Sequence, residues 1–585
     1  MNRTRRAGTR LTLTMVVVFL VVIVFSGRLF QLQVVQAAAL DKISVAQQST
    51  RVVTPGIRGS IVDTNGVVLA QSVDRFNVTV APKDFLLGYY RVPTDKGTFV
   101  PFATSIAKIA SLTGQSAADL TAVVTKDPTS DFAYLDKSVT LAMVTKLKKL
   151  KIPGIYYPIV AARSYPNGAI GGNVVGFVGT DGPQAGVELG YNSCLASTAG
   201  QSTYQTGADG VRIPGSTVKQ TDPVNGGTLQ LTIDTDLTYQ VDQAIIKQAQ
   251  VLNAPWATVV VERVADGHLM AVGDYPTVDP NDPGAAKSGA TGSLAFTQPY
   301  EPGSTFKAMS AAALIDSGAI TPLTHVVVPP VLRLSNGGSI KDSFYHGTLH
   351  YTTAGVLENS SNIGISLLSE NLPAQQRYNY MVKFGVGQKT AVSFGGQEPG
   401  HLPNPPWDPV TTKSVEFGQG VSATSVQVAQ IFETIANHGV REPSTLVEKC
   451  TEADGTVIDA PTIKPVRVVS AKAADEVRGM LETVVTGGPI SSLLKIPGYR
   501  IAAKTGTAQV AKANGGGYGK DYIISVAGMI PAENPQYVVV VTFGPTTLNT
   551  SAGAAPAFKN VMLDVIDRYR IPPSTTPAPY VQTTW

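Results

Sequence analysis

The chain of 585 residues is poor in cysteine, histidine and charge, and each shortage excludes a class of protein. Its two cysteines, Cys194 and Cys450, rule out a disulfide framework and a cysteine-based metal centre. They can pair with each other, but cysteines so far apart in sequence are more often unpaired. The six histidines are scattered without ligand-like spacing. Charged residues make up 15% of the chain and form no long basic run, which argues against a nucleic-acid partner.

Hydrophobic residues make up 43% of the chain, which excludes a largely disordered protein, and the length predicts about two to four domains. One apolar run, Leu11 to Phe30, is long enough to cross a bilayer. Four arginines precede it, and this asymmetry predicts a cytoplasmic N-terminus with the rest of the chain outside. The alternative is a cleaved signal peptide, with Ala37–Ala39 as the processing site. Because that site lies far beyond the strongest apolar segment, we favour a retained anchor over residues 11–35, after a cytoplasmic segment 1–10.

Residues 36–227 have a mixed composition with short β-like runs, and we interpret them as a non-catalytic domain. The stretch Arg58–Ala70 contains Asp63-Thr64-Asn65-Gly66, which is typical of a tight turn between two strands. Arg163–Gly168 and Gly186–Glu188 are further polar clusters flanked by turn residues. We expect all three to be structural rather than chemical.

The pattern changes at residue 228, where strands and helices become regular. Thr228–Ile233 alternates as a strand, and Asp234–Gln250 is helical with Asp234 or Thr235 as its cap. The later elements are expected at 258–264, 268–272, 522–530 and 536–543 for strands and 554–568 for a helix. This order predicts an α+β domain over 228–570, an antiparallel sheet flanked by helices, with its first and last strands adjacent. The Pro/Thr-rich tail 571–585 is expected to be loose.

The segment Glu301–Lys307 places a serine and a lysine at the start of a helix. Pro302 and Gly303 interrupt what precedes, and apolar residues then recur at helical spacing. Ser304 would lie in the first turn, where free backbone N–H groups favour negative charge. Lys307 would share its face and could act as a base if burial and a neighbouring charge lowered its pKa.

The same Ser-x-x-Lys spacing occurs twice more, so the motif alone is weak evidence for a site. Ser216 and Lys219 are followed by residues that break a helix. Ser492 and Lys495 run directly into Ile496-Pro497-Gly498. Ser304 differs because a sustained apolar helix and two further polar motifs follow it.

The two further motifs each have an ordinary structural explanation when taken singly. Ser360-Ser361-Asn362 follows a helical stretch, 353–359, and its hydroxyl and amide can face one way only on a bent turn. Lys504-Thr505-Gly506-Thr507 lies in a predicted strand, 501–510, where the glycine allows close approach of another backbone. The lysine and the two hydroxyls of that segment would suit a carboxylate.

In this order the three motifs resemble those of the penicillin-binding proteins and serine β-lactamases, and most closely a class B penicillin-binding protein of the cell-division type. The likeness extends to the stretches around Arg58, Arg163 and Glu188, which resemble the family's elongated α+β pedestal of dimerisation type. Asp279-Pro280-Asn281 and Phe417-Gly418-Gln419-Gly420 also match. Two departures are Thr64, where the family commonly has arginine, and Ser425, where it often has proline.

The resemblance implies a peptidoglycan D,D-transpeptidase that works through an acyl-serine. Ser304 would attack the bond between the last two D-alanines of a stem peptide, and Lys307 would take its proton. Ser360 and Asn362 would pass the proton on and hold the substrate amide. The backbone N–H groups of Ser304 and Thr507 would form the oxyanion hole.

For substrate binding, the resemblance assigns the terminal carboxylate to the segment Lys504, Thr505, Gly506 and Thr507. The charge of Lys504 would also help to keep Lys307 neutral. The reaction needs no metal or organic cofactor, and β-lactams would acylate the same serine.

Several interpretations of the role stay open. The alternatives are an elongation-type transpeptidase, a β-lactam sensor or β-lactamase of the same fold, and a scaffold of the division machinery without catalysis. No glycan-polymerising domain is recognisable, so we expect a membrane-bound glycan polymerase and division proteins as partners. The length and the Arg163–Glu188 region look more like the septal type.

Overall fold

The computed structural model describes residues 3–87, 100–152, 154–207, 211–217, 219–286, 291–458, 463–512 and 517–585. The chain divides into two compact units. Unit 1 comprises residues 1–57 and 197–225, and unit 2 comprises residues 58–196 and 226–585.

Unit 1 contains the apolar N-terminal helix and a small sheet. Helix α1 (Arg3–Phe30) continues through a π-helical turn, Gln31–Val35, into α2 (Ala37–Gln48). Within the described residues, one helical stretch, Gly8–Val35, is long and apolar enough to cross a membrane, with a mean hydropathy of 2.5. The predicted helix over Leu11–Phe30 is confirmed. Strands β1 (Ser49–Thr54), β9 (Gly200–Gln205) and β10 (Lys219–Thr221) form an antiparallel sheet in the order β1-β9-β10.

Unit 2 begins with an eight-stranded sheet. Its path is β20-β19-β11-β2-β3-β4, and β5 and β6 also pair with β3. The bounds are β2 (Ile61–Val62), β3 (Val68–Val80), β4 (Ala133–Val139), β5 (Ile155–Tyr156), β6 (Ile159–Ser164), β11 (Thr228–Leu231), β19 (Val447–Thr451) and β20 (Val457–Ile458). The predicted turn between two strands is confirmed, because the Asp63 carboxylate accepts hydrogen bonds from Asn65 N and Val67 N, each at 2.8 Å.

Strand β11 corrects the prediction for the order of strands. We expected this stretch to open the sheet of the second domain, beside its last strand. Instead β11 pairs in parallel with β2 and antiparallel with β19. The alternation of apolar and polar residues in β11 reflects one buried face, on which Leu229 and Leu231 are fully buried. A period of two predicts that a strand has such a face, but it does not show which sheet the strand joins.

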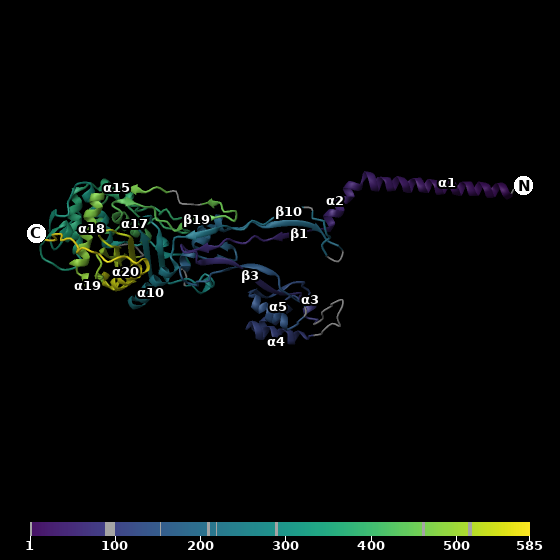
Figure 1. The fold of residues 1–585 in the computed structure, drawn as a ribbon, viewed down its shortest axis with the longest axis horizontal. Helices are drawn as coiled ribbons and strands as arrows, with labels where there is room; N and C mark the ends of the chain where they lie inside the picture. Colours follow the sequence, from purple (N-terminus) through teal and green to yellow (C-terminus); the bar gives the residue numbers. More distant parts are fainter. Residues whose placement is uncertain are drawn as a thin grey trace. The chain divides into compact units, whose positions relative to one another are not determined.

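The second sheet of unit 2 has five antiparallel strands in the order β13-β12-β24-β23-β22. They are β12 (Trp256–Arg263), β13 (Leu269–Tyr275), β22 (Ala502–Ala511), β23 (Tyr518–Ile530) and β24 (Tyr537–Thr546). Helices α10 (Thr235–Leu252) and α20 (Ala555–Tyr569) share one hydrophobic core with this sheet, α12 (Lys307–Asp316) and α17 (Ser425–Ala436) belong to another, and α18 (Ala471–Thr486) contributes to both. Helices α10, α17, α18 and α20 gather in the part of the ribbon that ends at the C-terminus (Figure 1). Asp234 caps α10, as predicted. The α+β fold with a helix-flanked antiparallel sheet is therefore confirmed.

The remaining helices and strands of unit 2 are shorter or peripheral. The helices are α3 (Pro82–Phe85), α4 (Phe102–Thr113), α5 (Ala117–Thr125), α6 (Leu141–Lys149), α7 (Gly172–Val175), α8 (Gly186–Gly190), α9 (Asn192–Leu195), α11 (Leu294–Thr297), α13 (Thr353–Glu358), α14 (Asn362–Leu368), α15 (Ala374–Lys383), α16 (Thr411–Ser414) and α19 (Ser491–Leu494). The strands are β7 (Val178–Gly179), β8 (Gly182–Pro183), β14 (His325–Val328), β15 (Leu332–Arg333), β16 (Ser339–Ile340), β17 (Leu349–Thr352), β18 (Val440–Arg441) and β21 (Val466–Arg467). Short 3₁₀ turns occur at Pro283–Ala285, Gly303–Phe306, Ser369–Asn371, Val415–Phe417 and Ser551–Gly553.

The two cysteines form a disulfide, which corrects the expectation that they are more often unpaired. Cys194 lies in α9 and Cys450 in β19, and their Cα atoms are 6.2 Å apart. Helix α9 packs on β11, whose neighbour in the sheet is β19. The pairing of strands thus brings together residues that are 256 positions apart in sequence.

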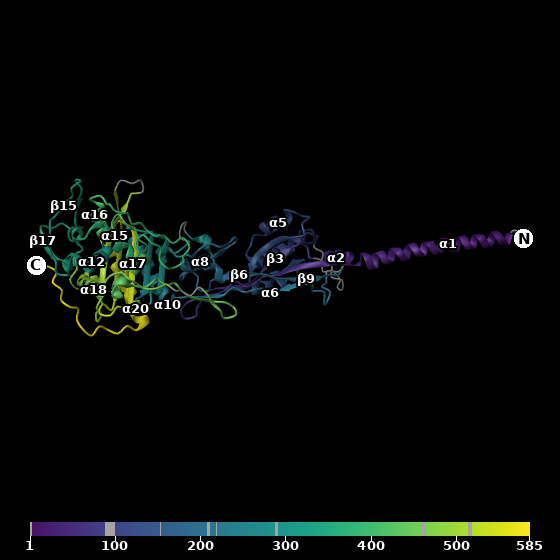
Figure 2. The same cartoon turned by 90° about the horizontal axis from the view of Figure 1, so that it is seen from above.

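The C-terminal tail is not loose as expected, because hydrogen bonds tie it to the domain although most of its residues are exposed. Figure 2 shows the yellow segment running along the domain from the end of α20 to the terminus beside β17. There Thr352 N donates to Thr583 O at 3.1 Å, and the Trp585 ring stacks on His325 at a centroid distance of 4.2 Å. Proline and threonine lower the helical propensity of the tail, but they do not prevent its backbone from pairing with a strand edge.

Candidate active site

Ser304 lies in the 3₁₀ turn Gly303–Phe306 that leads directly into α12. Gly303 has φ +57°, and a Cβ there would lie 3.0 Å from Thr507 O. A glycine is therefore required where this turn approaches β22. The helix that follows is buried from Lys307 to Ile315, so the serine is presented from a rigid element of the core.

The amine of Lys307 is fully buried and lies within hydrogen-bonding distance of the other predicted groups. Its Nζ is 3.1 Å from Ser304 Oγ, 3.2 Å from Ser360 Oγ and 2.7 Å from Asn362 Oδ1, and it also contacts Ser360 O. Burial lowers the pKa of Lys307 well below its ordinary value, and the positive charge of Lys504 lowers it further. A lysine in this state can be neutral and accept a proton from the serine.

The Ser360–Asn362 segment is the predicted bent turn. Helix α13 ends at Glu358 and α14 begins at Asn362. Ser360 between them has φ +57°, a left-handed conformation that is uncommon for a residue with a side chain. This bend directs the Ser360 hydroxyl and the Asn362 amide toward the same amine, which a continuous helix would not allow.

Lys504 lies in β22, and its Nζ is 2.8 Å from Ser360 Oγ. The side chain is fully buried, and burial lowers its pKa to about 7. Gly506 fits the predicted close approach, because a Cβ there would lie 2.3 Å from Ser525 Oγ and 2.8 Å from Pro302 O. The structure thus places Lys504 at the centre of the site, behind Ser360, while Thr505 and Thr507 line the open cavity.

A cavity of about 260 Å³ opens onto these groups. The predicted residues on its wall are Ser304, Ser360, Asn362, Thr505 and Thr507. Phe417 and Gln419, which belong to a segment that matched the family, also line the cavity. Sequence reasoning missed wall residues from loops and helix ends, among them Ser343, Phe344, Glu358, Asn359, Pro489, Ile490, Asn549, Thr550 and Ser551. They carry no periodic or spaced pattern, so only their position in space marks them.

The two other Ser-x-x-Lys copies lie elsewhere. Ser216 is in a turn of unit 1, where its hydroxyl donates to Ile213 O at 2.6 Å, and the Lys219 side chain is outside the described part. Ser492 lies in the four-residue helix α19, and Lys495 follows its end. The described side chains contain no group of three or more His, Cys, Asp or Glu placed to hold a metal.

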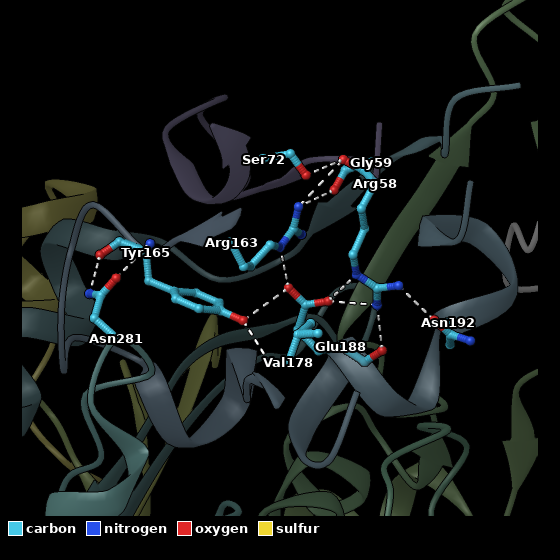
Figure 3. Close-up of polar contacts among 9 residues, drawn as sticks. All are labelled: Arg58, Gly59, Ser72, Arg163, Tyr165, Val178, Glu188, Asn192 and Asn281. Carbon is cyan, nitrogen blue, oxygen red and sulfur yellow. Dashed lines mark hydrogen bonds and ion pairs between the residues drawn. The ribbon is translucent and has the colours of Figure 1, made fainter. Parts of the chain in front are cut away.

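The polar clusters expected to be structural meet in a second site of unit 2, the Glu188 cluster, formed by Arg58, Arg163, Tyr165 and Glu188 (Figure 3). The fully buried Glu188 carboxylate lies between the two guanidinium groups, 2.6 Å from Arg58 Nη2 and 2.6 Å from Arg163 Nε. Tyr165 Oη donates to the same carboxylate at 3.4 Å. Asn281, on the loop before Ser304, binds the backbone of Tyr165 through both atoms of its amide.

A serine, a buried lysine, a Ser-Asn turn and a lysine-bearing strand on an α+β sheet together define the serine acyltransferases of the penicillin-binding class. The model of the penicillin binding protein transpeptidase domain matches residues 257–563, and that of the penicillin-binding protein dimerisation domain matches residues 53–231. The chain therefore belongs to the penicillin-binding protein transpeptidase family, and within it to the class B, FtsI type.

Similar proteins cover nearly the whole chain. Penicillin-binding protein PbpB of Mycobacterium tuberculosis is 33% identical over 96% of this chain and 85% of its own length. Peptidoglycan D,D-transpeptidase FtsI of Escherichia coli K12 is 28% identical over 94% and 90%. Among solved structures, a peptidoglycan synthetase from Bifidobacterium adolescentis has a TM-score of 0.72, 29% identity and coverage of 92% and 100%. Penicillin binding protein 3 from M. tuberculosis, complexed with aztreonam, has a TM-score of 0.69, 27% identity and coverage of 91% and 100%.

Proposed function

We propose that this protein is a peptidoglycan D,D-transpeptidase that cross-links stem peptides through an acyl-enzyme on Ser304. The observation that carries the proposal is the buried Lys307 amine, 3.1 Å from Ser304 Oγ, with its pKa held far down by burial and by Lys504. A nucleophilic serine needs such a base beside it. The relatives named peptidoglycan D,D-transpeptidase support the substrate class.

In the acylation step, Lys307 takes the Ser304 proton as the serine oxygen attacks the carbonyl between the last two D-alanines. The negative charge that develops on the carbonyl oxygen is stabilised by the backbone N–H groups of Ser304 and Thr507, a contribution worth roughly a hundredfold to a thousandfold in rate. Ser360, bonded to both lysines, carries the proton to the departing D-alanine, and Asn362 holds the substrate amide.

The substrate carboxylate binds to the open edge of β22, where Thr505 and Thr507 line the cavity and Gly506 keeps the strand close to the serine turn. Lys504 supplies positive charge behind these hydroxyls. In the second step an amine from a neighbouring stem peptide attacks the acyl-enzyme, and the serine oxygen leaves with a proton. β-Lactams enter the same path and stay bound to Ser304, as the β-lactam complexes of similar structures support.

The chain is a single-pass membrane protein with residues 1–10 in the cytoplasm and residues 11–35 as its anchor. The catalytic part lies outside, which is also supported by the Cys194–Cys450 disulfide, since such bonds persist in oxidising compartments. We divide the remainder into a pedestal, 36–227, a transpeptidase domain, 228–570, and a tail, 571–585. Strand β11, at the start of the proposed transpeptidase domain, pairs with β2 of the proposed pedestal.

The role is septal, with a membrane-bound glycan polymerase and division proteins as partners. The FtsI and PbpB names of the relatives favour this role over elongation. Depletion of the protein tests it, because filaments or chains of cells support a division role and rounded cells contradict it.

The catalytic assignment is tested by labelling the full chain with a fluorescent penicillin. Ser304→Ala is expected to abolish labelling without changing the thermal unfolding midpoint, while Ser216→Ala and Ser492→Ala serve as matched controls and label fully. Labelling of Ser304→Ala at the level of the unaltered protein would defeat the assignment.

A further inference from the structure

A buried carboxylate outside the three motifs, Asp342, lies directly behind the Ser360–Asn362 turn. Its side chain is fully buried. Its Oδ2 accepts a hydrogen bond from Ser361 Oγ at 2.7 Å, and its Oδ1 accepts one from Ile363 N at 3.0 Å. The two oxygens thus hold the residues on either side of Asn362.

The segment that carries Asp342 also fixes the Asn362 amide. Asn362 Nδ2 donates to Lys341 O at 3.1 Å, and this leaves Oδ1 facing the Lys307 amine at 2.7 Å. The imidazole of His346 lies behind Asp342, with its Nε2 3.2 Å from Asp342 Oδ2 but without a hydrogen bond between them. The orientation of a group that contacts the lysine therefore depends on a chain segment about twenty residues upstream.

The conformation of the turn requires such a restraint. Ser360 adopts φ +57°, which a residue with a side chain keeps only when its surroundings hold it there. The Ser361 hydroxyl donates a hydrogen bond to Asp342, and the same oxygen caps α14 by accepting one from Gly364 N at 2.8 Å. Losing the carboxylate would remove the anchor on the C-terminal side of the strained residue.

Asp342 also places a carboxylate near Lys307. It raises the pKa of Lys307, against burial and Lys504, which lower it more strongly. The other titratable groups around the carboxylate are His346 on its own segment and Tyr351 on β17, whose pKa is raised by burial and then by Asp342. The neighbouring Ser343 and Phe344 line the cavity, so this segment also borders the substrate space.

We propose that Asp342 is a positioning residue for acyl transfer, which holds the Ser360–Asn362 turn against Lys307 and sets part of the charge that the lysine experiences. This inference rests on the proposed function, because it assigns Asp342 a part in the chemistry of Ser304. It predicts two separable effects of Asp342, one on the geometry of the turn and one on the protonation of the base.

The test measures the rate of acylation by a fluorescent penicillin in the full chain in detergent, from about pH 5 to pH 9. Asp342→Asn is expected to lower the plateau rate on the order of tenfold to a hundredfold through misplacement of the turn. It is also expected to move the acidic limb of the profile to lower pH, because removing a negative charge lowers the pKa of Lys307. Ser361→Ala keeps the charge and loses the hydrogen bond, so it lowers the plateau and leaves the limb in place.

The matched control is Asp234→Asn, which alters another buried carboxylate, one that caps α10 and binds Arg568 Nε at 2.7 Å. It is expected to leave both plateau and limb unchanged. A limb that does not move in a folded Asp342→Asn protein overturns the inference, and so does a Ser361→Ala plateau equal to that of the unaltered protein. If the unaltered protein is not acylated at all, the proposed function itself fails.

Discussion

Unit 2 contains two clusters of buried charged side chains, and they offset the cost of burying charge in opposite ways. In the Glu188 cluster, one carboxylate lies between two guanidinium groups, and a tyrosine hydroxyl donates to it as well. In the lysine cluster, formed by Ser304, Lys307, Ser360, Asn362 and Lys504, two amines share one serine hydroxyl, and their hydrogen bonds go to uncharged oxygens.

The difference separates a structural cluster from a reactive one. Opposite charges in contact offset the cost of each other's burial and fix the chain around them. Buried amines without a carboxylate in contact avoid the cost of burial by losing protons. Burial lowers the pKa of both Lys307 and Lys504, and the charge of Lys504 lowers that of Lys307 further. Neutral lysines beside a hydroxyl provide the base that the chemistry needs.

The largest expected effect comes from removing the base. Lys307→Met should lower the rate of acylation by a fluorescent penicillin by roughly a hundredfold to ten-thousandfold, the usual contribution of a general base. The protein should stay folded, because an apolar side chain of similar length replaces a buried amine. Stopped-flow labelling and thermal unfolding measure the two quantities, and a rate within a few-fold of normal contradicts the role of Lys307.

The opposite pattern is expected for the Glu188 cluster. Glu188→Gln leaves two guanidinium groups without their buried anion and should cost about 3–5 kcal/mol of stability. The fraction that remains folded should be acylated at the normal rate, since Glu188 does not line the cavity. The control is Glu476→Gln, whose 3.9 Å ion pair with the exposed Lys472 lies at the surface with Glu476 half-buried and should be worth under about 0.5 kcal/mol. Equal stability losses in both variants, measured by denaturant unfolding, would break the comparison.

A smaller effect is expected on the pH dependence of acylation when the second lysine is removed. Lys504→Met deletes a positive charge, so the pKa of Lys307 rises and less of the base is neutral at a given pH. The acidic limb of the rate profile should therefore move to higher pH. Because the pKa of Lys504 is about 7, the difference should appear mainly below that pH, where the unaltered protein carries the charge. A limb that moves to lower pH rejects this coupling.

The smallest effect should come from one hydroxyl of the Glu188 cluster. Tyr165→Phe removes the donor to Glu188 Oε1 and the acceptor for Val178 N, which lies 3.0 Å from Tyr165 Oη. We expect a stability loss of about 1 kcal/mol, the usual value for a buried hydrogen bond, with unchanged acylation. A change in acylation rate without a change in unfolding midpoint would show that this cluster acts on the site, against the comparison.

Much of the site followed from the sequence because its residues stand in local motifs. The helix start at Ser304, the bend at Ser360 and the close approach at Gly506 each need particular residue types at fixed spacing. Asp342 escaped because a single aspartate has no spacing to recognise, and its importance arises from Ser361 and Ile363, which lie far along the chain.

Two predictions from the sequence were wrong because the sequence does not show which segment of the fold lies beside a given stretch. The alternating pattern of β11 predicted that the strand has a buried face. Only the pairing with β2 showed which sheet the strand joins. The composition of the tail indicated low helical propensity. It did not show that the tail would form hydrogen bonds with the strand edge at Thr352.

By itself the sequence determined the membrane-length apolar helix, the helix-flanked sheet and the three polar motifs, because these depend on periodicity and on residues close together in the chain. The tertiary structure alone decided the Cys194–Cys450 bond, the path of the tail and the meeting of two lysines at one hydroxyl. The physical reason is that burial and contact between distant segments set both the packing of an edge and the pKa of an amine, and neither is a property of any single stretch.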